Sequence, residues 1–218
     1  MSRVSKPNFT LQLNPSANHG SLYGPDQKAV LDTQGLARAR AIITAWPGYQ
    51  PTPLLQLPGL ARATRVCTVH LKDESQRFGL KSFKPLGGAY AVASLLLKNL
   101  ENSHRTAEIT VEDLLRGKYA SHSAAITVCA ATDGNHGRSV AWGAQLFGCR
   151  CVIFINEAVS FGREQAIAAY GAEVRRIPGS FDDAVRAAQR ISATEGWFVI
   201  PDTSDGNIID APRDVTQG

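Results

Sequence analysis

Two loops in this sequence combine residue types that can hold and activate a small carbonyl compound. Lys84 lies in the run Gly79-Leu80-Lys81-Ser82-Phe83-Lys84-Pro85-Leu86-Gly87-Gly88, between a predicted strand and a predicted helix. The run Thr132-Asp133-Gly134-Asn135-His136-Gly137 lies at a second predicted strand-to-helix turn. A lysine amine can hold an aldehyde cofactor as a Schiff base, and a nearby polar group can tune the cofactor's ring. Glycine, asparagine and lysine are also ordinary turn residues, so the spacing alone leaves a plain turn as an alternative.

Further motifs occur together with these loops. The stretches Pro51-Thr52-Pro53-Leu54 and Lys72-Asp73-Glu74-Ser75 precede Ser82-Phe83-Lys84, and Gly134-Asn135-His136-Gly137 follows it. In this combination the sequence resembles the pyridoxal-phosphate enzymes of fold type II. Each motif is weak by itself, and their combination is what makes the resemblance specific.

Three features are similar to one branch of that fold, the diaminopropionate ammonia-lyases. They are Arg77-Phe78-Gly79-Leu80 before the lysine, Asp133 before the Gly-Asn pair, and Pro201-Asp202-Thr203. Dehydratases and cysteine synthases of the fold commonly carry serine or threonine where this chain has Asp133. The resemblance therefore implies elimination of 2,3-diaminopropionate to pyruvate and ammonia, with pyridoxal 5'-phosphate as cofactor and an amino acid as substrate.

The resemblance also assigns roles to the residues that would bind the cofactor. Lys84 would form the Schiff base, Asn135 would hydrogen-bond the phenolic oxygen of the pyridoxal ring, and Gly134 and Gly137 would let the backbone pass close to it. The alternatives are a solvated lysine at a helix start and an asparagine that tolerates a left-handed turn. Lys81 competes with Lys84 for the covalent role, although solvent is its expected surroundings. We expect His136 to be a packed structural neighbour outside the chemistry.

Asp133 and Asp202 are the candidate bases for the α-proton of the substrate. Partial burial would raise the pKa of the Asp133 carboxyl and make it a better base. Two bases on opposite faces of the substrate would explain why the family accepts both stereoisomers. The alternatives are an Asx-turn at Asp133 and a simple turn residue at Asp202, ahead of Asp205-Gly206-Asn207. The alternative enzyme class is a threonine or serine dehydratase, and the presence of Asp133 disfavours it.

The second half of the sequence alternates between predicted strands and helices. Strands are expected at 125–130, 150–155, 173–177 and 197–200, and helices at 137–147, 160–170 and 181–194. Such alternation predicts right-handed β-α-β units and a parallel sheet with ligands at the carboxyl ends of its strands. Before it, we expect one helix at 26–46, a strand at 65–71, a helix from Lys84 to about Leu100, and a short helix whose capping signal begins at Thr110.

Together these elements predict an α/β chain like fold type II enzymes, with parallel open sheets and helices on both faces. Residues 1–82 would begin the large domain, 83–204 would form a complete small domain with four parallel strands, and 205–218 would begin the return to an incomplete large domain. The family's phosphate-binding glycine loop has no counterpart in the sequence. A truncated, non-catalytic remnant or partner subunit is therefore the second hypothesis, and a homodimer is expected if the missing half is supplied.

Composition narrows the function classes. The chain has 44% hydrophobic and 19% charged residues and a net charge of +4. This mild excess of positive charge, without a charged arm, does not favour nucleic-acid binding. No apolar run is long enough to span a membrane. The four cysteines and five histidines show no metal-ligand spacing, so no metal site is expected. Three of the cysteines lie in runs of strand character, which suits reduced, buried thiols, and the N-terminus lacks the apolar core of a signal peptide, so a cytoplasmic location is expected.

Overall fold

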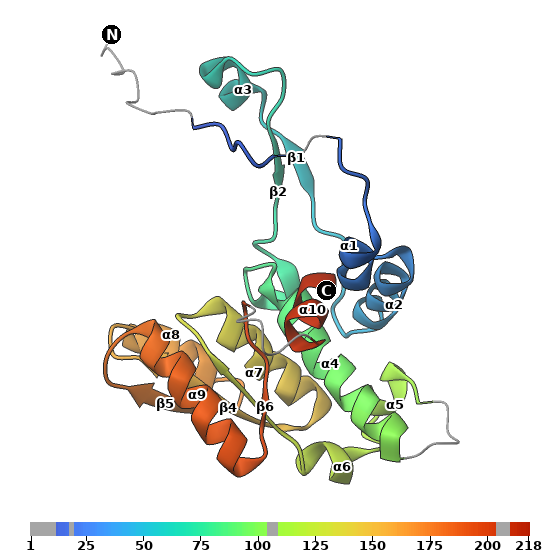
Figure 1. The fold of residues 1–218 in the computed structure, drawn as a ribbon, viewed down its shortest axis with the longest axis vertical. Helices are drawn as coiled ribbons and strands as arrows, with labels where there is room; N and C mark the ends of the chain where they lie inside the picture. Colours follow the sequence, from blue (N-terminus) through green and yellow to red (C-terminus); the bar gives the residue numbers. More distant parts are fainter. Residues whose placement is uncertain (1–11, 18–19, 104–108, 204–209) are drawn as a thin grey trace.

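A four-stranded parallel sheet forms the centre of the protein. The computed structural model describes residues 12–17, 20–103, 109–203 and 210–218 of the chain (Figure 1). The strands lie in the order β5-β4-β3-β6, and every pair of neighbours is parallel. Their bounds are Thr127–Ala131 for β3, Arg150–Asn156 for β4, Glu173–Ile177 for β5 and Phe198–Val199 for β6. This confirms the α/β fold class and the four parallel strands.

Helices cover both faces of this sheet. One face packs against α7 (Asn135–Phe147) and α8 (Phe161–Ala168), and the other against α9 (Phe181–Glu195). Because side chains alternate along a strand, Val128 and Ala130 of β3 contribute to the first core while Cys129 and Ala131 contribute to the second. The long helix α4 (Lys84–Ser103) packs on α7, and α10 (Asp210–Gln217) packs on α4 (Figure 1).

Close backbone approach explains the glycines of α4. A Cβ added to Gly88 would lie 2.0 Å from Ser139 Oγ of α7, and one added to Gly87 would lie 2.3 Å from the carbonyl oxygen of Val215 in α10. The two glycines therefore let neighbouring helices pack directly against α4.

Several helix ends lie where the sequence places them. Ser180 caps α9 by accepting a hydrogen bond from the Asp183 backbone, and Gly196 ends the helix in the left-handed conformation, with φ of 70°. Thr110 caps the short helix α5 (Val111–Leu115) in the same way. The helix α6 (Ala120–Ala124) then leads into β3. Side-chain caps and left-handed glycines are local signals, which is why they can be read without the tertiary structure.

The expectation of one helix over residues 26–46 was wrong. The segment forms α1 (Pro25–Val30) and α2 (Thr33–Thr44). Leu31 between them is extended, and Asp32 Oδ1 accepts a hydrogen bond of 2.6 Å from the backbone N–H of Gly35. An aspartate whose side chain binds the backbone in this way starts a new helix, and here that local bond overrides the helical pattern.

The expected strand over residues 65–71 was also wrong. The helix α3 (Pro58–Thr64) ends at Arg65, which is left-handed with φ of 58°, and the strand β2 covers only His70–Lys72. It pairs antiparallel with β1 (Leu54–Gln56) and is not part of a parallel sheet. The β-branched residues Val66 and Val69 fall outside the strand, because pairing with β1 and not intrinsic propensity sets its bounds.

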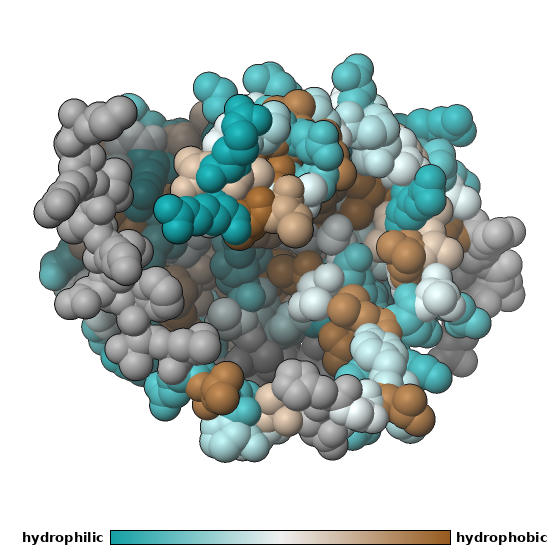
Figure 2. Space-filling model, turned by 90° about the horizontal axis from the view of Figure 1, so that it is seen from above, coloured by the Kyte–Doolittle hydropathy of each residue, from teal (hydrophilic) through white to brown (hydrophobic). Residues whose placement is uncertain are grey.

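The β1–β2 ribbon and α3 extend away from the four-stranded sheet (Figure 1). Both strands are exposed, and the leucines at 54, 55, 60 and 71 are at least 40% accessible. Seen from above, apolar residues lie among hydrophilic ones on this end of the molecule (Figure 2). By contrast α2, through Ile42 and Ile43, shares the core of α4, and so does Trp46 just after α2. The division of the chain at residues 82 and 204 stays a prediction.

No helix in the described part of the chain is long and apolar enough to cross a membrane.

Candidate active site

A cleft of about 580 Å³ opens at the carboxyl ends of the parallel strands. This volume lies within the range of small-molecule pockets, and the position is where open α/β sheets bind ligands. The start of α4, the β3–α7 loop, α8, the start of α9 and the segment after β6 all contribute to it. Its lining residues are Lys84, Ala131, Thr132, Asp133, Gly134, Asn135, His136, Arg138, Ser160, Gly162, Arg163, Ala166, Phe181 and Asp202.

Lys84 and Asp202 meet in this cleft although they are far apart in the sequence. Lys84 Nζ lies 2.6 Å from Oδ1 and 2.8 Å from Oδ2 of Asp202. Both side chains are about one-third exposed, at 29% and 33%. Lys84 is the first residue of α4, and its backbone N–H donates to Ser82 Oγ at 3.2 Å. The competitor Lys81 is exposed and lies outside the set that lines the cleft.

The loop before Lys84 is held by a buried arginine. Arg77 is 5% exposed and forms an ion pair with Glu74 at 2.7 Å. Its guanidinium also donates to the carbonyl oxygen of Gln50 at 2.8 Å and to Thr52 Oγ1 at 3.0 Å. These bonds tie the loop to the segment before β1, so the arginine of this motif has a structural role.

The aromatic residue of the same motif anchors the loop from the other side. The Phe78 ring stacks on that of Trp142 with centroids 4.8 Å apart. Trp46 of the α2 region packs against both rings, at 5.8 Å and 5.6 Å. Arg77 and Phe78 therefore fix the backbone from which Lys84 projects, without reaching into the cleft themselves.

The turn between β3 and α7 is organised by Thr132. Its Oγ1 accepts hydrogen bonds of 3.0 Å from the backbone N–H groups of Gly134 and Gly137. A Cβ added to Gly137 would lie 2.3 Å from Thr132 Cγ2 and 2.9 Å from Ile153 Cγ2, so only glycine lets α7 start this close to the strand. Asn135 is the first residue of α7, is exposed and lines the cleft.

Asp133 has partners different from those of Asp202. The side chain of Asn156, at the end of β4, donates a hydrogen bond of 2.6 Å to Asp133 Oδ1. Arg163 NH1 donates to the Asp133 carbonyl oxygen at 3.3 Å. The structure thus places two carboxylates in one cleft, one bound by an amide and the other paired with the lysine.

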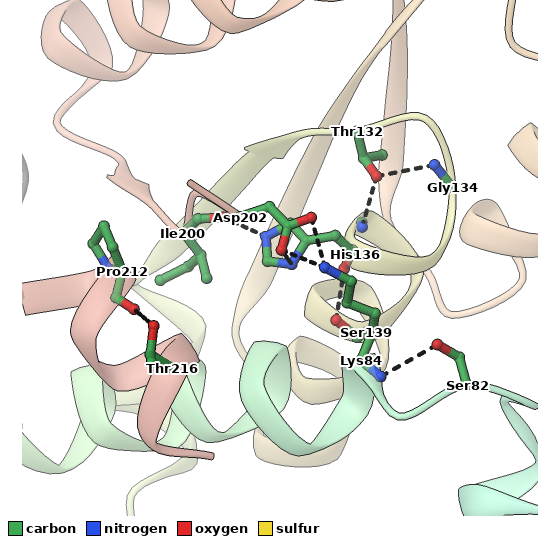
Figure 3. A network of polar contacts seen from close by, with 11 residues as sticks. Ser82, Lys84, Thr132, Gly134, His136, Ser139, Ile200, Asp202, Pro212 and Thr216 are labelled. Atoms are coloured by element: carbon green, nitrogen blue, oxygen red, sulfur yellow. Dashed lines mark hydrogen bonds and ion pairs between the residues drawn. The ribbon is translucent and has the colours of Figure 1, made fainter. Parts of the chain in front are cut away.

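The side chain of His136 lies beneath the ion pair of Lys84 and Asp202 and is only 3% exposed. Its Nε2 is 2.8 Å from the carbonyl oxygen of Ile200, and its Nδ1 is 3.7 Å from Asp202 Oδ1. Burial lowers the pKa of the imidazole, the nearby Lys84 lowers it further, and Asp202 acts in the opposite direction. In Figure 3 the side chains of Lys84, Asp202 and His136 point toward one another.

The sequence interpretation missed several of the residues that shape this cleft. Thr132 and Asn156 organise the Asp133 loop, and Arg138 and Arg163 add cationic side chains to the lining. Thr132 and Asn156 directly follow or end buried strands, and polar residues at the carboxyl ends of parallel strands are the signal that could have identified them.

The cleft fits the aldehyde and ring of pyridoxal phosphate by the chemistry of its donors. It offers a primary amine at Lys84, an exposed amide at Asn135, and the N-terminal backbone of the 13-residue helix α7. Cationic side chains at Arg138 and Arg163 complement an anionic ligand. Among the described residues, no group of three or more His, Cys, Asp or Glu side chains could hold a metal ion.

Comparison with known proteins decides the family. Residues 45–216 match the model of the family described as pyridoxal-phosphate dependent enzyme. The chain belongs to this family. Its resemblance to fold type II enzymes is thereby confirmed, and the cofactor of the family is the one that the sequence predicts.

Within the family, the chain is similar to ammonia-lyases. It is 37% identical over 175 residues to the diaminopropionate ammonia-lyase of Salmonella typhimurium. It matches the crystal structure of holo diaminopropionate ammonia-lyase from Escherichia coli with a TM-score of 0.75 and 35% identity, over 86% of this chain and 47% of that chain. The biosynthetic threonine dehydratase of Escherichia coli is more distant, at 27% identity over 170 residues, or 77% of this chain and 28% of the relative.

The match is partial in length. The aligned region covers 79% of this chain and 42% of the Salmonella relative. The matched region therefore spans less than half of the Salmonella enzyme, and the chain as a whole has about half the length of this relative.

Proposed function

We propose that the protein is a pyridoxal-phosphate-dependent ammonia-lyase that converts 2,3-diaminopropionate to pyruvate and ammonia. The observation that carries the proposal is the placement of the Lys84 amine in one cleft with the carboxylates of Asp133 and Asp202. An amine that can hold the cofactor and carboxylates that can accept a proton are the groups that an α,β-elimination requires. The similarity to diaminopropionate ammonia-lyases supports this choice of substrate.

The cofactor residues have separate tasks in this proposal. Pyridoxal phosphate, when bound, supplies an electron sink for the carbanion that forms at the substrate's α-carbon. Lys84 Nζ would hold its aldehyde carbon, and the Asn135 amide would donate to its ring oxygen. Gly134 and Gly137 would keep the start of α7 close to the ring, with Thr132 Oγ1 holding both of their N–H groups.

Asp133 and Asp202 would take the α-proton in this proposal. Each carboxylate lines the cleft, and each is held by a different neighbour, Asn156 for Asp133 and Lys84 for Asp202. The ion pair with Lys84 occupies Asp202 as long as the amine is free. If that amine held the cofactor's aldehyde, the Asp202 carboxylate would be available as a base. Two carboxylates in different positions would serve the two stereoisomers of the substrate.

The neighbouring alternative is a threonine or serine dehydratase. The presence of Asp133 disfavours a dehydratase. Its carboxylate can accept the α-proton, whereas a hydroxyl at this position would bind the substrate or donate a hydrogen bond to it. A homodimeric state and a cytoplasmic location remain predictions from the sequence.

Substrate comparison tests the proposal directly. With pyridoxal phosphate added, pyruvate release from 2,3-diaminopropionate is expected to exceed the release of keto acid from serine or threonine by about a hundredfold or more, since Asp133 is matched to this elimination. A coupled lactate dehydrogenase assay measures pyruvate, and a hydrazone assay measures all keto acids. Equal or faster turnover of threonine would assign the protein to the dehydratases.

A further inference from the structure

A buried nitrogen in the cleft has no hydrogen-bond partner among the residues that the structure describes. It is Nδ1 of His136. Burial of a polar atom without a partner is unfavourable, so such an atom needs an explanation. The Asp202 carboxylate lies close to it, with Oδ1 3.7 Å away, which is beyond hydrogen-bond distance. The histidine is 3% exposed and lines the cleft, which excludes free access of solvent to its ring.

The other ring nitrogen fixes the tautomer. Nε2 lies 2.8 Å from the carbonyl oxygen of Ile200, and a carbonyl oxygen can only accept, so Nε2 must carry the hydrogen. Because burial lowers the pKa of this imidazole, the ring is neutral, and its Nδ1 carries a lone pair instead of a hydrogen. The lone pair faces a carboxylate oxygen that is also an acceptor. These two atoms face each other without a hydrogen between them.

We propose that His136 is a positioning residue for Asp202, with Nδ1 placed to accept a hydrogen bond from the Asp202 carboxyl after that carboxyl has taken the substrate's α-proton. The inference rests on the proposed function. The Cα–H bond breaks, its electron pair stays on the substrate's α-carbon and is delocalised into the cofactor, and the proton moves to an Asp202 oxygen. The protonated carboxyl is a donor, and His136 Nδ1 is the acceptor beside it.

This arrangement favours proton abstraction because the bond forms only after the proton has moved. Before proton abstraction the Asp202 carboxylate and the His136 Nδ1 lone pair repel each other weakly. After abstraction the protonated carboxyl donates a hydrogen bond to that lone pair, so the interaction becomes attractive. An interaction that is stronger in the transition state than in the ground state raises the rate, whereas one present in both states does not. The Ile200 carbonyl contributes by keeping the hydrogen on Nε2, so that Nδ1 stays available as the acceptor.

Two charged groups face the histidine from the elements packed around it. Asp202, after β6, favours the imidazolium, and Lys84, at the start of α4, disfavours it. Asp133, Arg138 and Arg163 line the same cleft. If Nδ1 is coupled to Asp202, the protonation of His136 must therefore respond to changes at positions 84 and 202.

Nitrogen NMR of the histidine rings in the complete 218-residue chain, without cofactor, tests the inference. The expected spectrum shows the Nε2–H tautomer of His136 and a neutral ring at pH 7. Lys84→Met is expected to shift the protonation midpoint of His136 upward, because the repelling ammonium is lost. Asp202→Asn is expected to shift it downward, because the attracting carboxylate is lost. Lys81→Met is the matched control, since Lys81 is exposed and outside the cleft, and it should leave the midpoint unchanged.

Two results would overturn the inference. One is an Nδ1–H tautomer or a charged ring at pH 7. The other is a His136 midpoint that stays the same in Lys84→Met and Asp202→Asn, which would show that Nδ1 is not coupled to the Lys84–Asp202 ion pair. These outcomes do not depend on turnover, so the inference about His136 and the proposed function can fail separately.

A second measurement connects the histidine to the chemistry. His136→Gln keeps a side-chain donor for the Ile200 carbonyl and lacks the Nδ1 acceptor. In the cofactor-loaded protein, exchange of the substrate's α-proton with deuterated water is expected to slow about tenfold. Unchanged binding of pyridoxal phosphate to Lys84 in this variant shows that the site is intact. With the site intact, an exchange rate equal to that of the parent protein would overturn the role of His136.

Discussion

Lys84→Ala is expected to abolish covalent binding of pyridoxal phosphate. The Lys84 amine lies in the cleft beside Asp202, where it can reach the aldehyde of a bound cofactor. Without that amine no other described lysine lines the cleft to replace it. The variant should lose the visible absorbance of bound cofactor, and pyruvate release should fall by on the order of a thousandfold or more.

Lys81→Ala is the matched control for this experiment. It removes a lysine three residues away in the same loop, from an exposed position outside the cleft, and should keep both absorbance and activity. Far-UV circular dichroism should be unchanged in both variants, because α4 is buried through residues beyond Lys84. Loss of cofactor absorbance in Lys81→Ala with retention in Lys84→Ala would exchange the roles of the two lysines.

Asp133→Asn is expected to slow turnover of one stereoisomer of 2,3-diaminopropionate by on the order of a hundredfold or more. Asparagine has the shape of aspartate but cannot take up the α-proton. Its side-chain oxygen can still accept the hydrogen bond from Asn156, so the loop should keep its conformation. Steady-state rates with the separate D and L isomers measure the effect.

Asp202→Asn is the matched partner variant. It should slow the other stereoisomer, because Asp202 occupies a different position in the cleft and is held by Lys84 instead of Asn156. If either variant slows both isomers equally, or if both variants affect the same isomer, the assignment of one base to each face would be wrong.

The α/β fold could be read from the sequence because its signals are local. The strand at Glu173–Ile177 has the predicted bounds, and α9 at Phe181–Glu195 agrees with the predicted helix over 181–194 to within one residue. Two predictions were wrong, the strand over residues 65–71 and the single helix over residues 26–46. The first depends on strand pairing and the second on a single competing hydrogen bond. The bounds of β2 follow from its antiparallel partner β1, and Asp32 splits the first helix by binding the Gly35 backbone.

The candidate site was predictable in its residue types and not in its contacts. The motifs pointed to Lys84, Asp133 and Asp202, and the structure places all three in one cleft, although their roles stay proposals. The direct pairing of Lys84 with Asp202 links the start of α4 to the segment after β6, a contact that no spacing reveals. The orientation of the His136 ring depends likewise on the Ile200 carbonyl, which lies directly after β6.

Borohydride reduction of the wild-type protein with bound pyridoxal phosphate, followed by peptide mapping, tests the central claim most directly. The claim is that the cleft at the strand ends holds the cofactor through Lys84. The expected result is one pyridoxyl label, on the peptide that carries Lys84. A label on Lys81, or labels spread over surface lysines in proportion to their exposure, would contradict the claim.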